Sequence, residues 1–162
     1  MIIYMIMIKL GAHQSIAGGY IQALERINNI GGNCLQIFSS SPRGWNFAKT
    51  GDNEIKQFLT LKSKLKIDPI YFHASYLINL ADGSRIGHMS KLSLISELNL
   101  APKLGIKGSI VHLGSYKNEV SGIKYEVLIR NIKEILNKTP KKSLFIIENA
   151  GNRKIGQTLE EI

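Results

Sequence analysis

Three short apolar segments constrain the fold of this chain more than any other feature of its sequence. They run from Ile70 to His73, from Ser109 to His112 and from Phe145 to Glu148. Each is apolar on both faces of an extended strand, as buried strands of parallel sheets are, and each leads through a polar turn into a stretch with helical spacing. The pattern predicts βα units, whose strands all open their carboxyl ends onto one face.

Alternating strands and helices are predicted along the whole chain. We expect strands near residues 3–10, 33–38, 69–73, 107–112 and 143–148. Helices are expected from Ser15 to Gly31, around Leu59 to Lys66, from Lys91 to Leu104 and from Tyr125 to Asn137. Glycines after the first and third helices favour a left-handed cap, and Pro140 prevents the fourth helix from continuing.

The chain is basic. It has 162 residues, enough for one domain with a core, and its 21 Lys and Arg against 12 Asp and Glu give a formal charge of +9. This excess favours a polyanionic partner, nucleic acid before others. The alternative is that lysine runs such as Lys62 to Lys66 and Lys141-Lys142 only solvate helix faces and turns.

A single cysteine, Cys34, excludes a disulfide framework and fits a reducing compartment. The segment from Met1 to Ile8 is apolar, but it has no basic leader and is too short to cross a bilayer. We therefore expect this segment to be the first strand, in a cytoplasmic protein that has no membrane partner.

The last residues carry a helix-start signal. Thr158 to Glu161 forms a capping box, but the chain stops at Ile162, and one helical turn is unstable alone. Five parallel strands also leave apolar edges unpaired, whereas eight close a barrel. We interpret residues 1–162 as a single incomplete α/β domain, about the first five units of a (β/α)8 TIM barrel. A complete small open sheet is the alternative.

Three predicted strands end in potential metal ligands. Convergence of His73, His112 and Glu148 at one rim would form the two-imidazole, one-carboxylate set of several catalytic zinc sites. Glu148 is the catalytic and bridging candidate, although a carboxylate before Asn149 to Gly151 can also serve a turn. His13, after the first apolar segment, is a further residue near the site, and His88 is given no role.

Two loops on the same predicted face resemble contacts to DNA. The first, after the second strand, contains Arg43 and Trp45, and the second, after His73, contains Tyr76 and Leu77. Proteins that distort duplex DNA use Arg on phosphates or in grooves and push apolar or aromatic side chains into the base stack. Trp45 and Leu77 can alternatively serve to cover the barrel rim.

Four blocks carry a family resemblance. In order and spacing, Gly11 to Gly19, His73 to Leu80, His112 to Ser115 and Glu148 to Gly151 resemble the amino-terminal part of endonuclease IV, also called deoxyribonuclease IV. The resemblance implies a barrel of the xylose-isomerase-like type. It also implies a zinc-dependent DNA-repair endonuclease that cuts the phosphodiester 5′ to abasic sites and trims 3′ ends.

The resemblance also assigns residues. It implies that His73 and His112 bind one zinc ion, that Glu148 bridges to a second, and that Arg43, Tyr76 and Leu77 contact double-stranded DNA containing abasic sites. The family uses a cluster of three zinc ions, whose other ligands lie on later strands that this chain lacks. We therefore expect at most one largely complete zinc site here and impaired activity.

Two other functions stay open. One is a sugar isomerase or epimerase of the same barrel superfamily, which would use a divalent metal to polarise a hydroxyl and a carbonyl. The other is a non-catalytic DNA-binding fragment that needs a complementing carboxyl-terminal chain. The basic excess and the two loops suit an extended anion better than a sugar.

Overall fold

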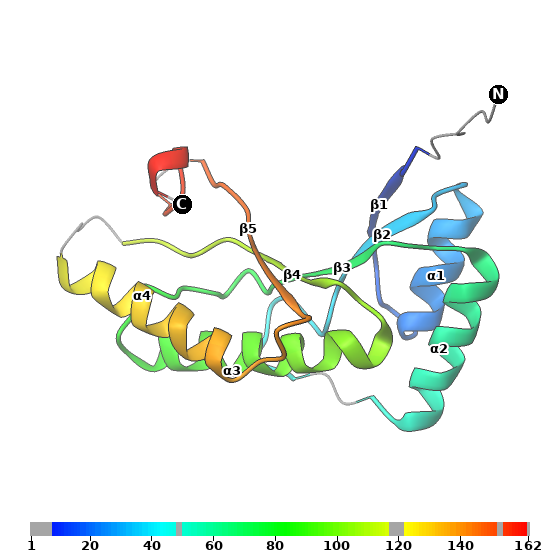
Figure 1. Ribbon diagram of the computed structural model, residues 1–162, viewed down its shortest axis with the longest axis horizontal. Coiled ribbons are helices and arrows are strands. Elements are labelled where there is room, and N and C mark those ends of the chain that lie inside the picture. The colour runs from blue at the N-terminus through cyan, green and yellow to red at the C-terminus, as the bar shows by residue number, and fades with distance from the viewer. Residues whose placement is uncertain (1–7, 48–49, 117–121, 152–153, 162) are drawn as a thin grey trace.

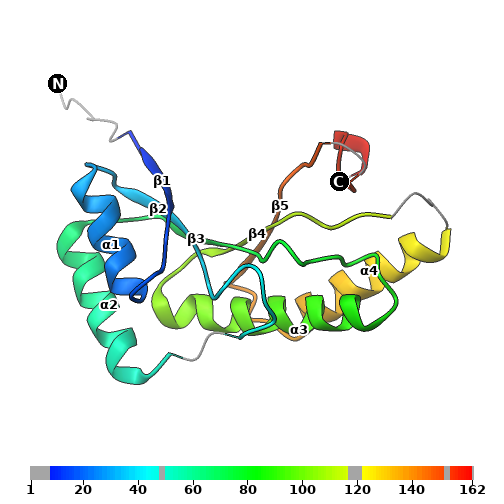
Figure 2. The ribbon, with the colours of Figure 1, turned by 180° about the vertical axis from the view of Figure 1, so that it is seen from behind.

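A parallel sheet runs through the molecule. The computed structural model describes residues 8–47, 50–116, 122–151 and 154–161 (Figure 1 and Figure 2). Its strands lie in the order β1-β2-β3-β4-β5, with bounds Gly11–Gln14, Cys34–Phe38, Ile70–His73, Gly108–Val111 and Leu144–Ile147. Consecutive parallel strands are the arrangement that a barrel of βα units requires, so the predicted fold class is confirmed.

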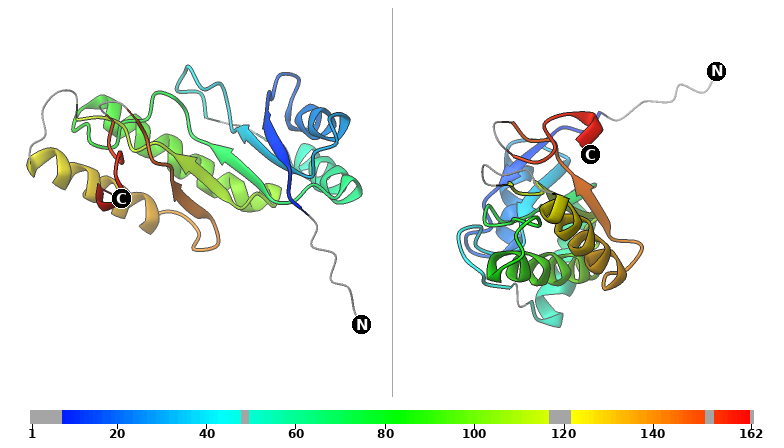
Figure 3. Two further views of the ribbon diagram at one scale, coloured as in Figure 1. Left: turned by 90° about the horizontal axis from the view of Figure 1, so that it is seen from above. Right: turned by 90° about the vertical axis from the view of Figure 1, so that its left-hand side faces the viewer.

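Four α-helices cover one side of this sheet (Figure 1 and Figure 3). They are α1 (Tyr20–Asn29), α2 (Asp52–Leu65), α3 (Arg85–Leu100) and α4 (Gly122–Asn137), and the short 3₁₀ helix η1 (Ala101–Leu104) extends α3. All four predicted helices are present. None of the helices in the described ranges is both long and apolar enough to cross a membrane.

The first strand is displaced from its predicted position. Residues 1–7 of the predicted strand lie outside the described residues, and Ile8 to Leu10 precede the strand, which begins at Gly11. Pairing with β2 decides where the strand starts. Asn33, just before β2, bonds to Ile8 and Leu10, and the first paired residues of the ladder are Gly11 and Cys34. The strand prediction is wrong for residues 8–10, where Ile8 is 79% and Leu10 71% exposed.

Alternate residues of the strands face different surroundings. Leu35, Ile37, Ile70 and Phe72 are buried against the helices. Their neighbours on the opposite face, such as Tyr71, are only partly buried. The expectation of equal burial on both faces therefore does not hold for this chain. The less buried face is the one that carries the site.

The segment after β5 folds back on the rim. Ile155 is buried and donates its backbone N–H to the carbonyl oxygen of Gly114 at 3.0 Å. The capping box forms a single 3₁₀ turn, η2 (Leu159–Glu161), and the Glu161 carboxylate accepts from the backbone N–H groups of Gly156 and Gln157. The Ile155 bond holds the loop after β5 against the loop after β4, and the Glu161 bonds brace the segment after β5 internally.

Candidate metal centre

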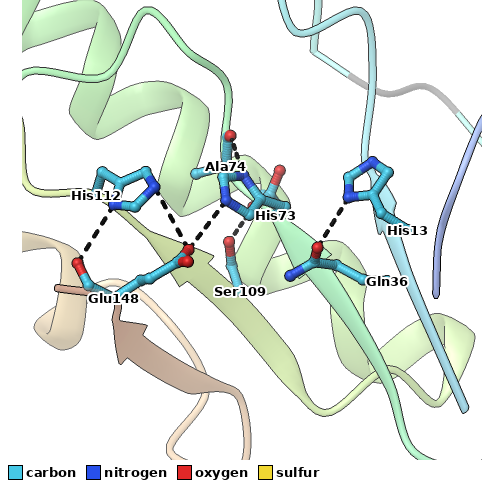
Figure 4. Close-up of polar contacts among 8 residues, drawn as sticks. His13, Gln36, His73, Ala74, Ser109, His112 and Glu148 are labelled. Atoms are coloured by element: carbon cyan, nitrogen blue, oxygen red, sulfur yellow. Dashed lines mark hydrogen bonds and ion pairs between the residues drawn. The ribbon is translucent and has the colours of Figure 1, made fainter. Parts of the chain in front are cut away.

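Three side chains meet at the carboxyl ends of neighbouring strands. His73 ends β3, while His112 and Glu148 directly follow β4 and β5. One ligand atom of each residue lies within 4.8 Å of the others (Figure 4). The Oε2 atom of Glu148 is 3.2 Å from Nε2 of His73 and 3.5 Å from Nε2 of His112. The structure thus brings together the three residues that the sequence singled out as ligands.

Strand pairing fixes where these residues stand. The backbone N–H of Glu148 donates to the carbonyl oxygen of Val111 at 3.0 Å, and that of Ala74 donates to the carbonyl oxygen of Ile110 at 2.8 Å. The parallel ladder therefore continues past the ends of β3 and β5. Because side chains alternate between faces, His73 and Glu148 reach the same open face of the sheet.

Backbone carbonyls orient both imidazoles. Nδ1 of His73 lies 2.8 Å from the carbonyl oxygen of Ala74, and Nδ1 of His112 makes a longer contact of 3.4 Å with that of Glu148. A carbonyl oxygen only accepts hydrogen bonds, so we assign the ring proton to Nδ1 in both residues. Each Nε2 faces Oε2 of Glu148 and is the ring nitrogen that can bind a metal beside this carboxylate, as in sites whose ligand histidines donate their other N–H.

The donor set fits zinc. Two imidazole nitrogens and one carboxylate oxygen are the protein ligands of several catalytic zinc sites, which keep a fourth position open. The three side chains range from 13% exposed for His73 to 32% for His112 and 44% for Glu148. The group is therefore fixed on the side of the sheet and open on the other.

His13 lies beside this group without belonging to it. It stands on β1, where its Nδ1 is 2.9 Å from Oε1 of Gln36. Its ring centroid is 6.1 Å from that of His73 and 4.5 Å from that of Phe38. The structure places it near the site, in a row of imidazoles along the strand ends (Figure 4).

The two predicted DNA-contact loops are tied to each other. Ser75 donates its hydroxyl to the carbonyl oxygen of Pro42 at 2.8 Å, which joins the loop after β3 to the loop after β2. Arg43 is exposed, and Tyr76 is 67% exposed with its ring centroid 5.2 Å from that of Phe38. These two side chains are accessible to a ligand.

The other two predicted contacts are less accessible. Trp45 is partly buried and packs against the cluster of buried side chains around α3 and β4, and Leu77 is also partly buried. The placement of Trp45 fits the alternative of a residue that covers the rim.

A cavity of about 290 Å³ opens next to the ligands. The residues that line it include His73, His112, Tyr76, Leu77 and Lys154. Apart from the two histidines, Lys154 is the only basic side chain among the lining residues that the structure describes, and none of these residues is acidic. Sequence reasoning missed Lys154, for which the only signals were its charge and its place after the fifth strand. A larger cavity, of about 640 Å³, lies along the outer face of α4 and contains none of the ligands.

Comparison with known proteins identifies proteins of similar sequence. No family profile matches the chain. A protein of Persephonella marina named probable endonuclease 4 is 31% identical over 160 residues, and one of Thermosipho melanesiensis with the same name is 37% identical over 164 residues. Each match covers 96% of this chain and 56% of the relative, so the chain spans about half the length of these proteins.

Comparison with solved structures also finds an endonuclease IV. The crystal structure of endonuclease IV from Thermus thermophilus has a TM-score of 0.82 and 30% identity, covering 93% of this chain and 56% of that one. A D-tagatose 3-epimerase-like protein has a TM-score of 0.70 but only 18% identity, which shows a shared fold alone. By sequence and by fold, this chain is similar to endonuclease IV over a little more than half of that protein's length.

Proposed function

We propose that this chain belongs to a zinc-dependent DNA-repair endonuclease that cleaves the phosphodiester 5′ to abasic sites and trims 3′ ends. The observation that carries the proposal is the approach of His73, His112 and Glu148 to within 4.8 Å at the strand ends. The similarity to proteins named probable endonuclease 4 supports it independently.

In this proposal His73, His112 and Glu148 are the residues that would hold zinc, and Glu148 is also the residue that would bridge to a second ion. Zinc, when bound, supplies an acidified water and positive charge near the phosphate. The chain's own contribution is orientation, because carbonyl oxygens fix both rings and the ladder fixes Glu148. Preset ligands lose little freedom on binding.

Exposed side chains around the centre suit a DNA ligand. Arg43 offers a cation to phosphate, and the exposed Tyr76 with Leu77 offers an aromatic and apolar wedge beside the cavity. Lys154 adds a cation inside the cavity wall. Turning out an abasic nucleotide needs little energy, because it has no base to unstack. Trp45, which is packed, is proposed to support its loop next to DNA.

We also propose that residues 1–162 form one incomplete barrel domain with at most one largely complete zinc site of a cluster of three. Exposed apolar side chains lie next to both edge strands, with Leu10 71% exposed before β1 and Leu144 49% exposed in β5. A complementing carboxyl-terminal chain with the further βα units would cover them. The free thiol of Cys34 is compatible with the cytoplasmic location that we propose.

A sugar isomerase or epimerase is the weaker alternative. The epimerase-like structure shares the fold at 18% identity, whereas the relatives above 30% identity carry the endonuclease name. Within the described ranges, the residues that line the cavity include Lys154 and no acidic residue, which suits a phosphate better than a neutral sugar.

The test combines metal and DNA binding by the purified chain. Calorimetry is expected to show one zinc ion per chain, and a His73→Ala, His112→Ala double variant is expected to show none. Fluorescence anisotropy should show binding of abasic duplex that weakens steeply with salt. Absence of zinc binding together with salt-insensitive DNA binding would contradict the proposal.

Cleavage is measured in the same samples. We expect weak or no cleavage of abasic duplex, and cleavage restored when a second polypeptide supplies the remaining strands. Strong cleavage by the 162-residue chain alone, lost on chelation, would refute its impairment but support the nuclease.

A further inference from the structure

A carboxylate that the metal centre does not use is buried between α3 and the sheet. Glu97 is only 4% exposed. Burial raises its pKa from 4.5 to about 7, and no neighbouring cation opposes this effect in the described part of the chain. A buried carboxylate without a cation is costly unless it is well hydrogen-bonded. Its partners therefore indicate what it holds in place.

Both oxygens of Glu97 accept hydrogen bonds from serines on different strands. The Ser39 hydroxyl donates to Oε2, and the Ser109 hydroxyl donates to Oε1. Ser39 directly follows β2 and Ser109 lies in β4, while β3 runs between these strands. One carboxylate thus joins two strands that are not neighbours, across the back of the strand between them.

Strand β3, which lies between the two strands that Glu97 joins, carries His73. Phe72, opposite Ser109 in the β3–β4 register, is fully buried on the helix side, so His73 next to it faces the metal centre. Ser109 lies on the strand that leads into His112. After β2, the Tyr20 hydroxyl donates to the carbonyl oxygen of Ser39, so that Ser39 is held by a second hydrogen bond.

Ser39, one of the two serines bound to Glu97, also lies next to residues of the metal centre and of the predicted DNA-contact loops. Phe38 precedes Ser39, and its ring centroid lies 5.7 Å from that of His73 and 5.2 Å from that of Tyr76. The loop with Arg43 starts from the same residue. A displacement of Ser39 would therefore move both an aromatic neighbour of the ligand and the base of this loop.

We infer that Glu97 is a positioning residue, which holds Ser39 and Ser109 together and thereby fixes the spacing of β2, β3 and β4 where His73 and His112 emerge. The inference rests on the proposed function, because it concerns the same metal centre. A carboxylate is suited to this role because both of its oxygens accept, whereas a glutamine offers one accepting oxygen.

The test compares three variants that change single buried groups. Ser109→Ala removes one donor, Glu97→Gln removes one acceptor, and Ser143→Ala is the control. Ser143 is also buried at 7% exposure, but it lies just before β5 and its hydroxyl has no hydrogen-bond partner in the described structure. Folding of each variant is checked by circular dichroism.

Two measurements report on position rather than on stability. The first is the NMR signal of the His73 and His112 rings in the metal-free chain, and the second is zinc affinity with the absorption spectrum of bound cobalt. We expect Ser109→Ala and Glu97→Gln to shift the ring signals, alter the cobalt spectrum and weaken zinc binding about tenfold. Ser143→Ala should change none of these.

Unchanged ring signals and zinc affinity in folded Ser109→Ala would overturn the inference, and so would equal changes in Ser143→Ala. If Glu97→Gln fails to fold, Ser109→Ala alone decides. If the wild-type chain binds no zinc but Ser109→Ala still shifts the ring signals, positioning by Glu97 is supported and the metal proposal fails.

Discussion

The two faces of the sheet differ in packing although they share the same strands. On the helix side, Ile70 and Phe72 of β3 are fully buried. On the opposite side, Tyr71 and His73 of the same strand are only partly buried, and the metal centre lies there. The difference teaches that most of the packing and most of the chemistry are assigned to alternate residues of the same strands.

The largest expected effect breaks the packed face. Phe72→Ala should lower the free energy of unfolding by about 3–5 kcal/mol, because it leaves a cavity among fully buried side chains. Tyr71→Ala, one residue away on the other face, should cost about 1 kcal/mol. Urea unfolding followed by circular dichroism measures both. Equal losses would show that the two faces are packed alike.

The next effect concerns the carboxylate on the packed face. Because the pKa of Glu97 is raised from 4.5 to about 7 by burial, the folded chain keeps a proton that the unfolded chain releases between these values. The contribution of Glu97 to the free energy of unfolding is therefore fully present below about pH 4.5. It falls, by on the order of 3 kcal/mol, as the pH rises to about 7.

Glu97→Gln should remove this pH-dependent loss. Tyr20 faces Glu97 from α1, and since burial raises the pKa of this tyrosine, it stays uncharged throughout the range. Thermal unfolding at several pH values measures the difference between wild type and variant. A difference that does not vary with pH would show that Glu97 ionises normally.

A smaller free-energy change is expected on the open face. His73→Ala should weaken zinc binding at least about 100-fold, equivalent to about 2.7 kcal/mol, because it removes a ligand and not only an outer contact. Its effect on unfolding should stay near about 1 kcal/mol, as for other partly buried residues. Calorimetry and urea unfolding measure the two quantities. A loss of stability as large as that of Phe72→Ala would contradict the separation of the faces.

The smallest expected effect is at the cavity wall. Lys154→Met should reduce the slope of log affinity against log salt for abasic duplex by about 1, because one phosphate contact is lost. Lys142→Met, at the other end of β5, is the matched control and should leave the slope unchanged. Fluorescence anisotropy over a salt series measures both. Equal slopes for all three proteins would remove Lys154 from the DNA surface.

The sequence predicted most of the elements because local pattern determines them. The helix spacing of Tyr20, Ala23, Leu24 and Ile27 is the buried face of α1. Apolar segments ending in His73, His112 and Glu148 predicted both the strands and the residues that converge, since parallel strands open on one edge. The first strand was misplaced, because pairing with β2, and not apolar character, sets its start.

Glu97 and Lys154 were not found from the sequence. Glu97 has ordinary helical neighbours in the chain, and only the packing of α3 on the sheet gives it Ser39 and Ser109 as partners. Lys154 looks like one of many surface lysines, and only the return of its loop to Gly114 places it at the cavity.

The sequence by itself determined the alternation of strands and helices, the basic charge and the ligand types at the strand ends, because these depend on residue identity and local spacing. The tertiary structure alone decided the strand register, the distances among the three ligands, and which carboxylate is buried. Those properties depend on residues that are distant in the chain, which become neighbours only when the sheet and its helices pack.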